Sequence, residues 1–230
     1  MKHQSFKLCL LIAVMTAVLV VFGSITVFAS DVSGTCGDNL KWMFDADAET
    51  LTISGTGDMQ DYDNPKITPW DQYRNKIKQV VINKGVTSLG SRAFRGFKQL
   101  TSVSIPSSVT SIGPSAFSGC SQLTSISIPN SVTSIGYGTF YGCRSLTNIT
   151  IPDGVTSIRD SAISDGSSVT NVYYLGNENT WKKIKIGDDN EKLKTAEIIY
   201  VVRIYKFESH GGSTVSDIYN EIKVCPTTVY

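Results

Sequence analysis

One stretch of the chain occurs twice in succession with few changes. Residues 100–122 read LTSVSIPSSVTSIGPSAFSGCSQ and residues 123–145 read LTSISIPNSVTSIGYGTFYGCRS, so a unit of 23 residues repeats without a gap. A looser copy begins at Ile77, a decaying copy at Leu146 and a divergent copy at Val169. Self-similarity at such a period is typical of a solenoid, in which each unit buries the apolar face of its neighbour.

Within the unit, the positions that stay apolar predict two short strands and a turn. Alternation at 103–105 indicates a strand, and the equivalent strands of successive copies are expected to lie side by side in a parallel sheet. Pro106 ends this strand because proline cannot donate to the ladder. We expect a second short strand or extended turn at 109–112, and a tight helical turn at 116–119. The sequence therefore predicts a mainly β solenoid.

The segments that flank the repeats predict caps. Residues 30–76 do not follow the repeat, and two alternating runs, 40–44 and 51–53, predict a β-hairpin in an N-terminal capping region. A solenoid end exposes an apolar cross-section that an atypical unit has to cover. We expect this cover from five residues: Trp42, Phe44, Leu51, Ile53 and Trp70. Residues 169–200 predict a divergent fifth repeat with a mixed C-terminal cap, and residues 201–230 a partial second β module or tail.

The first residues predict export. Lys2 and Lys7 precede an uncharged run over 8–22, and 27–29 (Val-Phe-Ala) offers small residues where a signal peptidase cleaves. We expect a signal peptide at 1–29 and a secreted or cell-surface, extracellular location. The alternative is an uncleaved anchor, since about 20 apolar residues suffice to span a bilayer. A membrane contact is expected only through this segment, if it stays uncleaved.

Two cysteines occupy the same position of successive copies. Cys120 and Cys143 align with each other, and Phe97 stands at the equivalent position of the copy before. An apolar residue at that position favours a buried slot that holds thiols. A disulfide is the alternative, because export permits disulfides and stacked side chains lie about 5 Å apart.

The composition excludes several classes of function. A formal net charge of +1 argues against a nucleic-acid partner. His210 is the one histidine after the predicted signal, so we expect no catalytic residues, no cofactor-binding residues and no metal ligands, and the chain is not expected to be an enzyme. The run Asp45-x-Asp47-x-Glu49 resembles the start of a calcium loop, but a polar hairpin turn explains it better because Thr50 replaces the required glycine.

The repeat resembles a known family. Residues 100–120 and 123–143 match L-T-S-[IV]-x-I-P-x-S-V-T-S-I-G-x-x-A-F-x-G-C, the unit of BspA-type leucine-rich repeats, and four 23-residue units cover 77–168. The resemblance implies a leucine-rich repeat β-solenoid with short helical turns in a secreted or surface protein of a host-associated bacterium. The family is used for adhesion or for binding protein or glycan, and it has no enzymatic motif of its own. Residues 205–217 resemble the opening of a Listeria–Bacteroides repeat.

The outward positions of the predicted strands form the candidate ligand-binding surface. These positions are Ser102, Ser104, Ser125, Ser127, Asn148, Thr150, Asn171 and Tyr173. Small hydroxyl and amide groups beside an aromatic residue suit a glycan or an extended peptide, and they suit a neutral solvated sheet equally well. We predict a module that binds a host extracellular protein or a surface glycan. The alternatives are a passive scaffold or stalk, and the accessory domain of a longer secreted enzyme.

Overall fold

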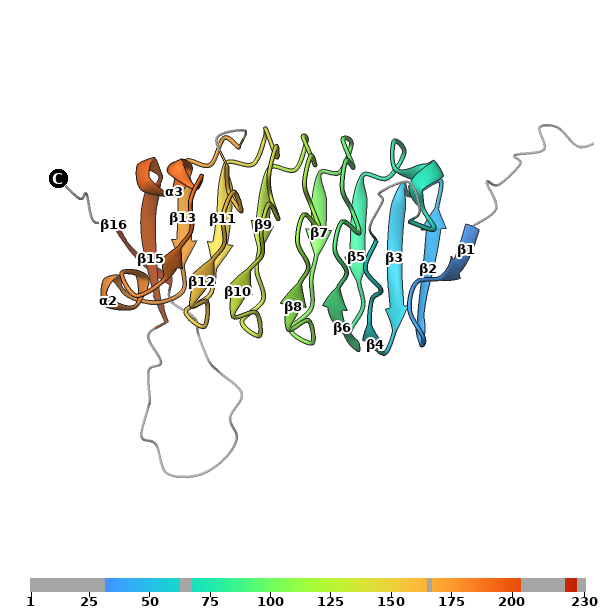
Figure 1. Cartoon of the computed structure of the whole chain (residues 1–230), viewed down its shortest axis with the longest axis horizontal. Helices are drawn as coiled ribbons and strands as arrows, with labels where there is room; N and C mark the ends of the chain where they lie inside the picture. The colour runs from blue at the N-terminus through green and yellow to red at the C-terminus, as the bar shows by residue number, and fades with distance from the viewer. Residues whose placement is uncertain (1–31, 63–67, 165–166, 204–221, 227–230) are drawn as a thin grey trace, which may run out of the picture. The chain divides into compact units, whose positions relative to one another are not determined.

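Parallel strands, one from each of the five copies of the repeat and one from the C-terminal cap, form the main sheet of the solenoid, which is interrupted once (Figure 1). These strands are β5 (Gln79–Ile82), β7 (Ser102–Ser104), β9 (Ser125–Ser127), β11 (Asn148–Ile151), β13 (Asn171–Tyr174) and β15 (Glu197–Arg203). Gln79 lies opposite Ser102, Ser125 opposite Asn148, and Asn148 opposite Asn171. The period of the sequence is thus the register of the sheet, which confirms the predicted β-solenoid.

The computed structural model describes residues 32–62, 68–164, 167–203 and 222–226. All of these residues belong to one compact unit. The predicted signal peptide at 1–29, the resemblance at 205–217 and His210 lie outside the described residues.

A second set of short strands runs beside the main sheet, with one strand after each of β3 (Thr50–Gly55), β5, β7, β9, β11 and β13. It contains β4 (Gly57–Asp58), β6 (Val86–Leu89), β8 (Ser111–Ile112), β10 (Ser134–Ile135), β12 (Ser157–Ile158) and β14 (Lys185–Ile186). They pair in parallel in the orders β4-β6-β8 and β10-β12-β14. Of the two possibilities left open at 109–112, the structure has the short strand, and Val109 and Ile112 are buried as expected.

The segment after the second strand forms hydrogen-bonded turns, where the sequence predicted a helical turn. The amide of Ser118 donates to the carbonyl of Ser115 (3.1 Å). The amide of Phe117 instead donates to the carbonyl of Thr139 (3.0 Å), which lies in the next turn of the solenoid, called the next coil from here on. A helix cannot continue when alternate amides bind the neighbouring coil. The same position takes a left-handed φ of 54–60° in four coils, at Arg92, Ser115, Gly138 and Ser161.

Both sheets are interrupted at the same joint, between the two most similar copies. Among the described residues, no ladder pairs join β7 to β9 or β8 to β10. The turns still bridge this joint, because the amides of Ser115 and Gly119 donate to Tyr137 (2.9 Å) and Tyr141 (2.7 Å). This joint therefore depends on the turns, on the bond that Ser131 Oγ donates to the carbonyl of Val109, and on core packing.

A column of aromatic rings runs through the core from coil to coil. The ring centroids of Trp70 and Phe94 are 5.8 Å apart, those of Phe94 and Phe117 5.3 Å, and those of Phe117 and Phe140 5.9 Å. All four side chains are fully buried. Each ring covers the next, so no coil has a complete core of its own.

The cysteine slot beside this column holds free thiols, which confirms the buried-slot interpretation over the disulfide. Cys120 and Cys143 are free and buried, as is Cys36, and Phe97 fills the same slot one coil earlier. The Sγ atoms of Cys120 and Cys143 donate to the carbonyls of Phe94 (3.2 Å) and Phe117 (3.1 Å). Burial raises the pKa of Cys36 and of Cys143 from 9.0 to about 12.

The N-terminal cap is the predicted β-hairpin with one further strand. β2 (Leu40–Asp45) pairs antiparallel with β3 (Thr50–Gly55), and β3 continues in parallel onto β5. All five predicted covering side chains are buried. β1 (Val32–Thr35) adds an antiparallel edge strand that its sequence did not reveal, since Val32 is its one large apolar residue.

The acidic run of this cap lies in the hairpin turn. Asp45 Oδ1 accepts hydrogen bonds from the amides of Asp47 (2.9 Å) and Ala48 (2.8 Å). Glu49 forms an ion pair with Lys78 (2.7 Å). These contacts match the polar-turn interpretation.

A short 3-10 helix, η2 (Asp71–Tyr73), then brings Trp70 onto the first coil.

The C-terminal cap adds α2 (Glu178–Trp181), α3 (Glu191–Thr195) and β16 (Ile222–Pro226), which pairs antiparallel with β15. The ring of Tyr174 packs against Trp181 (5.2 Å) and Tyr200 (6.3 Å), which closes the core at this end. No helix among the described residues is long and apolar enough to cross a membrane.

Replacing Phe117 with alanine tests the aromatic column. We expect Phe117→Ala to lower the free energy of unfolding by about 3–5 kcal/mol, because the neighbouring rings of Phe94 and Phe140 lose their shared contact. Tyr141→Ala is the control, since Tyr141 is exposed. Urea denaturation measures both, and a loss below about 1 kcal/mol for Phe117→Ala would contradict the column's role.

The thiol slot is tested with a chromogenic disulfide reagent on a Cys9→Ser/Cys225→Ser chain. We expect Cys36, Cys120 and Cys143 to stay unreactive at about pH 9 in the folded protein, because burial disfavours the reactive thiolate. All three should react after denaturation in urea. Rapid labelling of any of them in the folded chain would show that the slot is open to solvent.

Candidate functional site

The eight residues predicted to bind a ligand lie on the outer side of the main sheet, which we call the strand face, and they form two rows across it. Ser125, Asn148 and Asn171 lie opposite one another in the first row. Ser127, Thr150 and Tyr173 do so in the second. The structure brings these six residues together on one continuous ladder. Ser102 and Ser104 lie on β7, beyond the interruption, where they pair with Gln79 and Val81.

The two halves of this face differ in how their polar groups are held. The four predicted serines are exposed, and their hydroxyls make no hydrogen bond within the described part of the chain. Asn148, Thr150, Asn171 and Tyr173 are half-buried. Asn171 Nδ2 donates to Asn148 Oδ1 (2.9 Å), and Asn148 Nδ2 donates to Thr147 Oγ1 (3.0 Å). The amides are therefore fixed in orientation, whereas the serine hydroxyls remain available to a ligand.

Most threonine hydroxyls beside these rows have a structural role. The Oγ1 atoms of Thr101 and Thr147 donate to the carbonyls of Lys78 (3.0 Å) and Thr124 (3.3 Å), one coil earlier. Thr110 and Thr156 do the same on the second sheet. Each of these carbonyls also accepts the backbone amide of the same threonine, so the hydroxyl adds a second bond between the coils. The abundance of threonine thus reflects the joining of coils.

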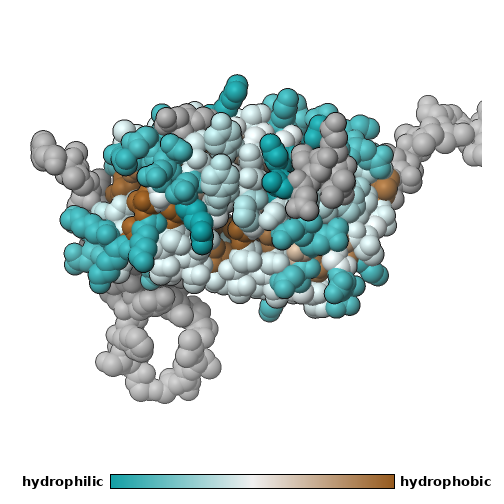
Figure 2. Space-filling view, viewed as in Figure 1, coloured by the Kyte–Doolittle hydropathy of each residue, from teal (hydrophilic) through white to brown (hydrophobic). Residues whose placement is uncertain are grey.

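The middle of the solenoid has almost no charge. Arg144 and Asp153 are the only charged residues between positions 100 and 158. Figure 2 shows one face of the surface, with pale, near-neutral residues over much of the middle and more hydrophilic residues toward the ends. The strand face therefore offers a partner hydroxyl and amide groups for hydrogen bonding, and it lacks a strong electrostatic potential.

A groove lies on the second sheet, beside the C-terminal cap, and sequence reasoning did not find it. Its volume is about 390 Å³, and it is lined by Tyr137, Ser157, Ile158, Arg159, Asp160, Lys185, Ile186 and Gly187. Ser157 lies opposite Lys185 and Ile158 opposite Ile186. One feature of the sequence could have indicated this groove: a position of the repeat that varies between copies, where Tyr137 stands in place of Pro114 and Asp160 of the neighbouring copies.

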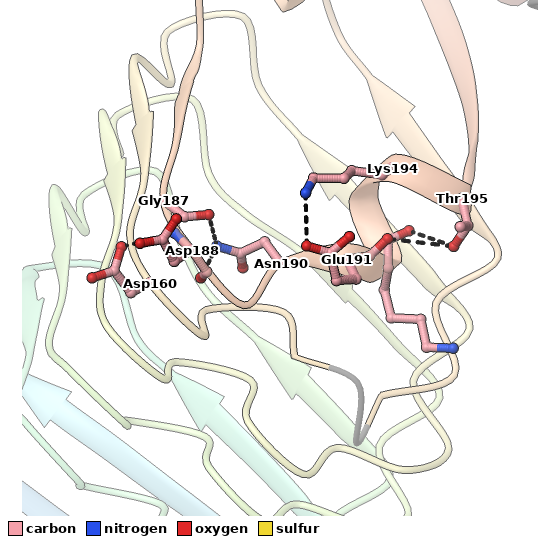
Figure 3. Close-up of polar contacts among 8 residues, drawn as sticks. Asp160, Gly187, Asp188, Asn190, Glu191, Lys194 and Thr195 are labelled. Carbon is pink, nitrogen blue, oxygen red and sulfur yellow. Dashed lines mark hydrogen bonds and ion pairs between the residues drawn. The ribbon is translucent and has the colours of Figure 1, made fainter.

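Asn190 holds the loop that forms one wall of this groove (Figure 3). Its side chain is buried, and Nδ2 donates to the carbonyls of Arg159 (2.9 Å), Gly187 (2.9 Å) and Asp188 (3.1 Å). Its Oδ1 accepts from the amide of Ile163 (2.9 Å). Asp160 Oδ1 accepts from the amide of Asp188 (3.0 Å). The Asn190 amide thereby reinforces the attachment of the cap to the last regular coil, which the pairing of β12 with β14 also provides.

Comparison with known proteins gives a family match and several structural neighbours. The model of the BspA type leucine rich repeat region matches residues 72–186 in six copies. A leucine-rich repeat protein from Eubacterium ventriosum aligns with 28% identity and a TM-score of 0.54, over 66% of this chain and 45% of that chain. A leucine rich cell surface protein from Faecalibacterium prausnitzii aligns with 26% identity and a TM-score of 0.53, over 65% of this chain and 41% of that chain.

The chain thus spans less than half the length of either of these two structures. No curated protein matches it.

Replacing Asn190 tests the attachment of the C-terminal cap. We expect Asn190→Ala to lower the free energy of unfolding by about 2–4 kcal/mol, since it leaves the buried amide of Ile163 without its partner and removes the bonds that Nδ2 donates to three carbonyls. Asn179→Ala is the matched control, because Asn179 is exposed in α2. Equal stability of the two variants in urea denaturation would refute this role for Asn190.

Proposed function

The chain belongs to the BspA-type leucine-rich repeat family, and on that premise we propose that it is an extracellular binding module that adheres to a host protein or a surface glycan through its strand face. Leucine-rich repeat proteins are typically non-enzymatic binding modules, so the proposed role is binding and not catalysis. The family and the neighbour described as a cell surface protein support an extracellular or surface location. Secretion through residues 1–29 is part of the proposal.

The register of the polar rows is the observation that carries this proposal. Ser125, Asn148 and Asn171 repeat one hydrogen-bonding position at each coil, and Ser127, Thr150 and Tyr173 repeat another. Regularly spaced hydroxyl and amide groups match a ligand that is itself regular, such as an extended peptide or a glycan chain. Tyr173 adds an amphipathic ring at one end of the second row.

The chain aligns with less than half of each matched structure, and this favours one alternative role. Because it spans under half of the matched structures, it resembles a part of such proteins, and a scaffold or accessory unit of a longer secreted protein is the second candidate. In that role the strand face has no ligand of its own. A binding measurement separates the two roles.

Arginine substitutions on the strand face test the proposal. We expect the full chain to bind at least one member of an array of extracellular-matrix proteins and neutral glycans, and Ser104→Arg/Ser127→Arg to lower that affinity at least about tenfold through bulk and charge. Ser107→Arg/Ser111→Arg is the matched control, because both serines are exposed and lie off the strand face. Surface plasmon resonance measures affinity, and thermal unfolding verifies that both variants fold.

Two results would overturn the adhesion role. Either no array member binds, or both double variants bind as tightly as the unmodified chain. The first result leaves the scaffold role, and the second places the site on another surface.

A further inference from the structure

The groove on the second sheet combines two cations that lack acidic partners. Lys185 and Arg159 are both exposed, and both line the groove. Neither forms an ion pair within the described residues, whereas Lys182 and Lys194, elsewhere on the same cap, are paired with glutamates at 2.6 Å. The parallel pairing of β12 with β14 sets Lys185 opposite Ser157. Arg159 follows Ser157 by two residues in the same coil. The groove therefore presents two free cations from neighbouring coils.

Exposed apolar surface is concentrated beside these cations. Among the described residues, the large hydrophobic side chains that are exposed are Met43, Tyr137, Tyr141 and Ile186. Two of the four, Tyr137 and Ile186, line the groove and are 56% and 39% exposed. A single exposed apolar residue needs no explanation. An exposed tyrosine ring and an isoleucine beside convergent polar groups have the composition of a small-ligand site.

We propose that this groove binds carboxylate-bearing sugar residues of an acidic glycan. An arginine fork matches a carboxylate with two parallel hydrogen bonds, and the lysine adds a point charge. The ring of Tyr137 offers a face on which the apolar side of a pyranose stacks. The Ser157 hydroxyl and the Asp160 carboxylate provide partners for sugar hydroxyls, and Asp160 can accept from them.

The local charge pattern favours an acidic sugar over an acidic peptide or a nucleic acid. Asp160 lies in the groove, its carboxylate accepts from the amide of Asp188, and Asp189 accepts from Ser161 (3.3 Å). A densely anionic ligand meets this row of carboxylates and is repelled. A sugar chain that carries about one carboxylate per residue and several hydroxyls can place the carboxylate on the cations and the hydroxyls on Asp160.

The groove is held in shape without a ligand. The bonds of Asn190 fix the loop at 187–190 against the carbonyl of Arg159. Gly187 lies so close to Asp160 that a Cβ atom there would collide with it. A preformed site avoids the entropy of ordering a loop on binding. None of the eight predicted strand-face residues lines the groove, so this proposal does not depend on the proposed function.

Isothermal titration calorimetry of the full chain tests the proposal with defined probes. The probes are oligomers of galacturonic acid, hyaluronan tetrasaccharide and sialyllactose, each beside its methyl ester, together with hexaglutamate. We expect at least one carboxylated sugar to bind with a Kd below about 10 mM, and its ester to bind at least about tenfold more weakly because it has lost the charge. Hexaglutamate should bind more weakly than that sugar.

Matched variants locate the site. We expect Lys185→Gln and Arg159→Gln each to weaken binding about tenfold, and Tyr137→Ala several-fold. Lys183→Gln is the control for charge, because Lys183 is exposed on the same cap and does not line the groove. Ser104→Arg/Ser127→Arg should bind the probe unchanged, which separates this site from the strand face. Thermal unfolding of each variant verifies its fold.

The proposal is overturned if no carboxylated sugar binds at about 10 mM, or if the ester binds as tightly as the acid. It is also overturned if Lys183→Gln weakens binding as much as Lys185→Gln, which would indicate a general charge effect. Tighter binding of hexaglutamate would assign the groove to an acidic peptide instead.

Discussion

Every other feature of this molecule depends on the hydrogen bonds that join each coil to the next in a fixed register. Except at the joint between β7 and β9, the strand of one coil pairs with the strand of the next, and turn amides such as that of Phe117 donate to the following coil at that joint too. Threonine hydroxyls donate a second bond to carbonyls that already accept a backbone amide from the next coil. Because backbone and core are both completed by a neighbour, a single coil is not stable, and the array requires caps at both ends.

The caps differ in what they leave on the surface. The N-terminal hairpin extends the main sheet and buries Trp42 and Phe44 over the first coil. The C-terminal cap continues both sheets, through β14 and β15, and places α2 before β14 and α3 between the two strands. The pairing of β14 with β12 sets charged Lys185 and exposed Ile186 beside the last regular coil. The molecule therefore has two surfaces of different chemistry, a neutral strand face and a charged groove.

The candidate site was only partly predictable. Alternation in each copy placed all eight strand-face residues on outward positions, because a two-residue period decides which side chains face the core. It did not reveal that Asn148 and Asn171 bind each other, or that the ladder stops between β7 and β9. The groove was missed because its cations, Arg159 and Lys185, come from a regular coil and from a segment where the repeat is no longer recognisable.

The sequence by itself determined the coil, its period, the buried positions and the identity of the family. It could do so because each copy meets the same neighbours, so one environment is recorded several times in the chain. The tertiary structure alone decided the turns in place of a helical turn and the attachment through Asn190. Those features depend on contacts between residues that occur once, or on amides whose partners lie in another coil, and no periodic pattern records them.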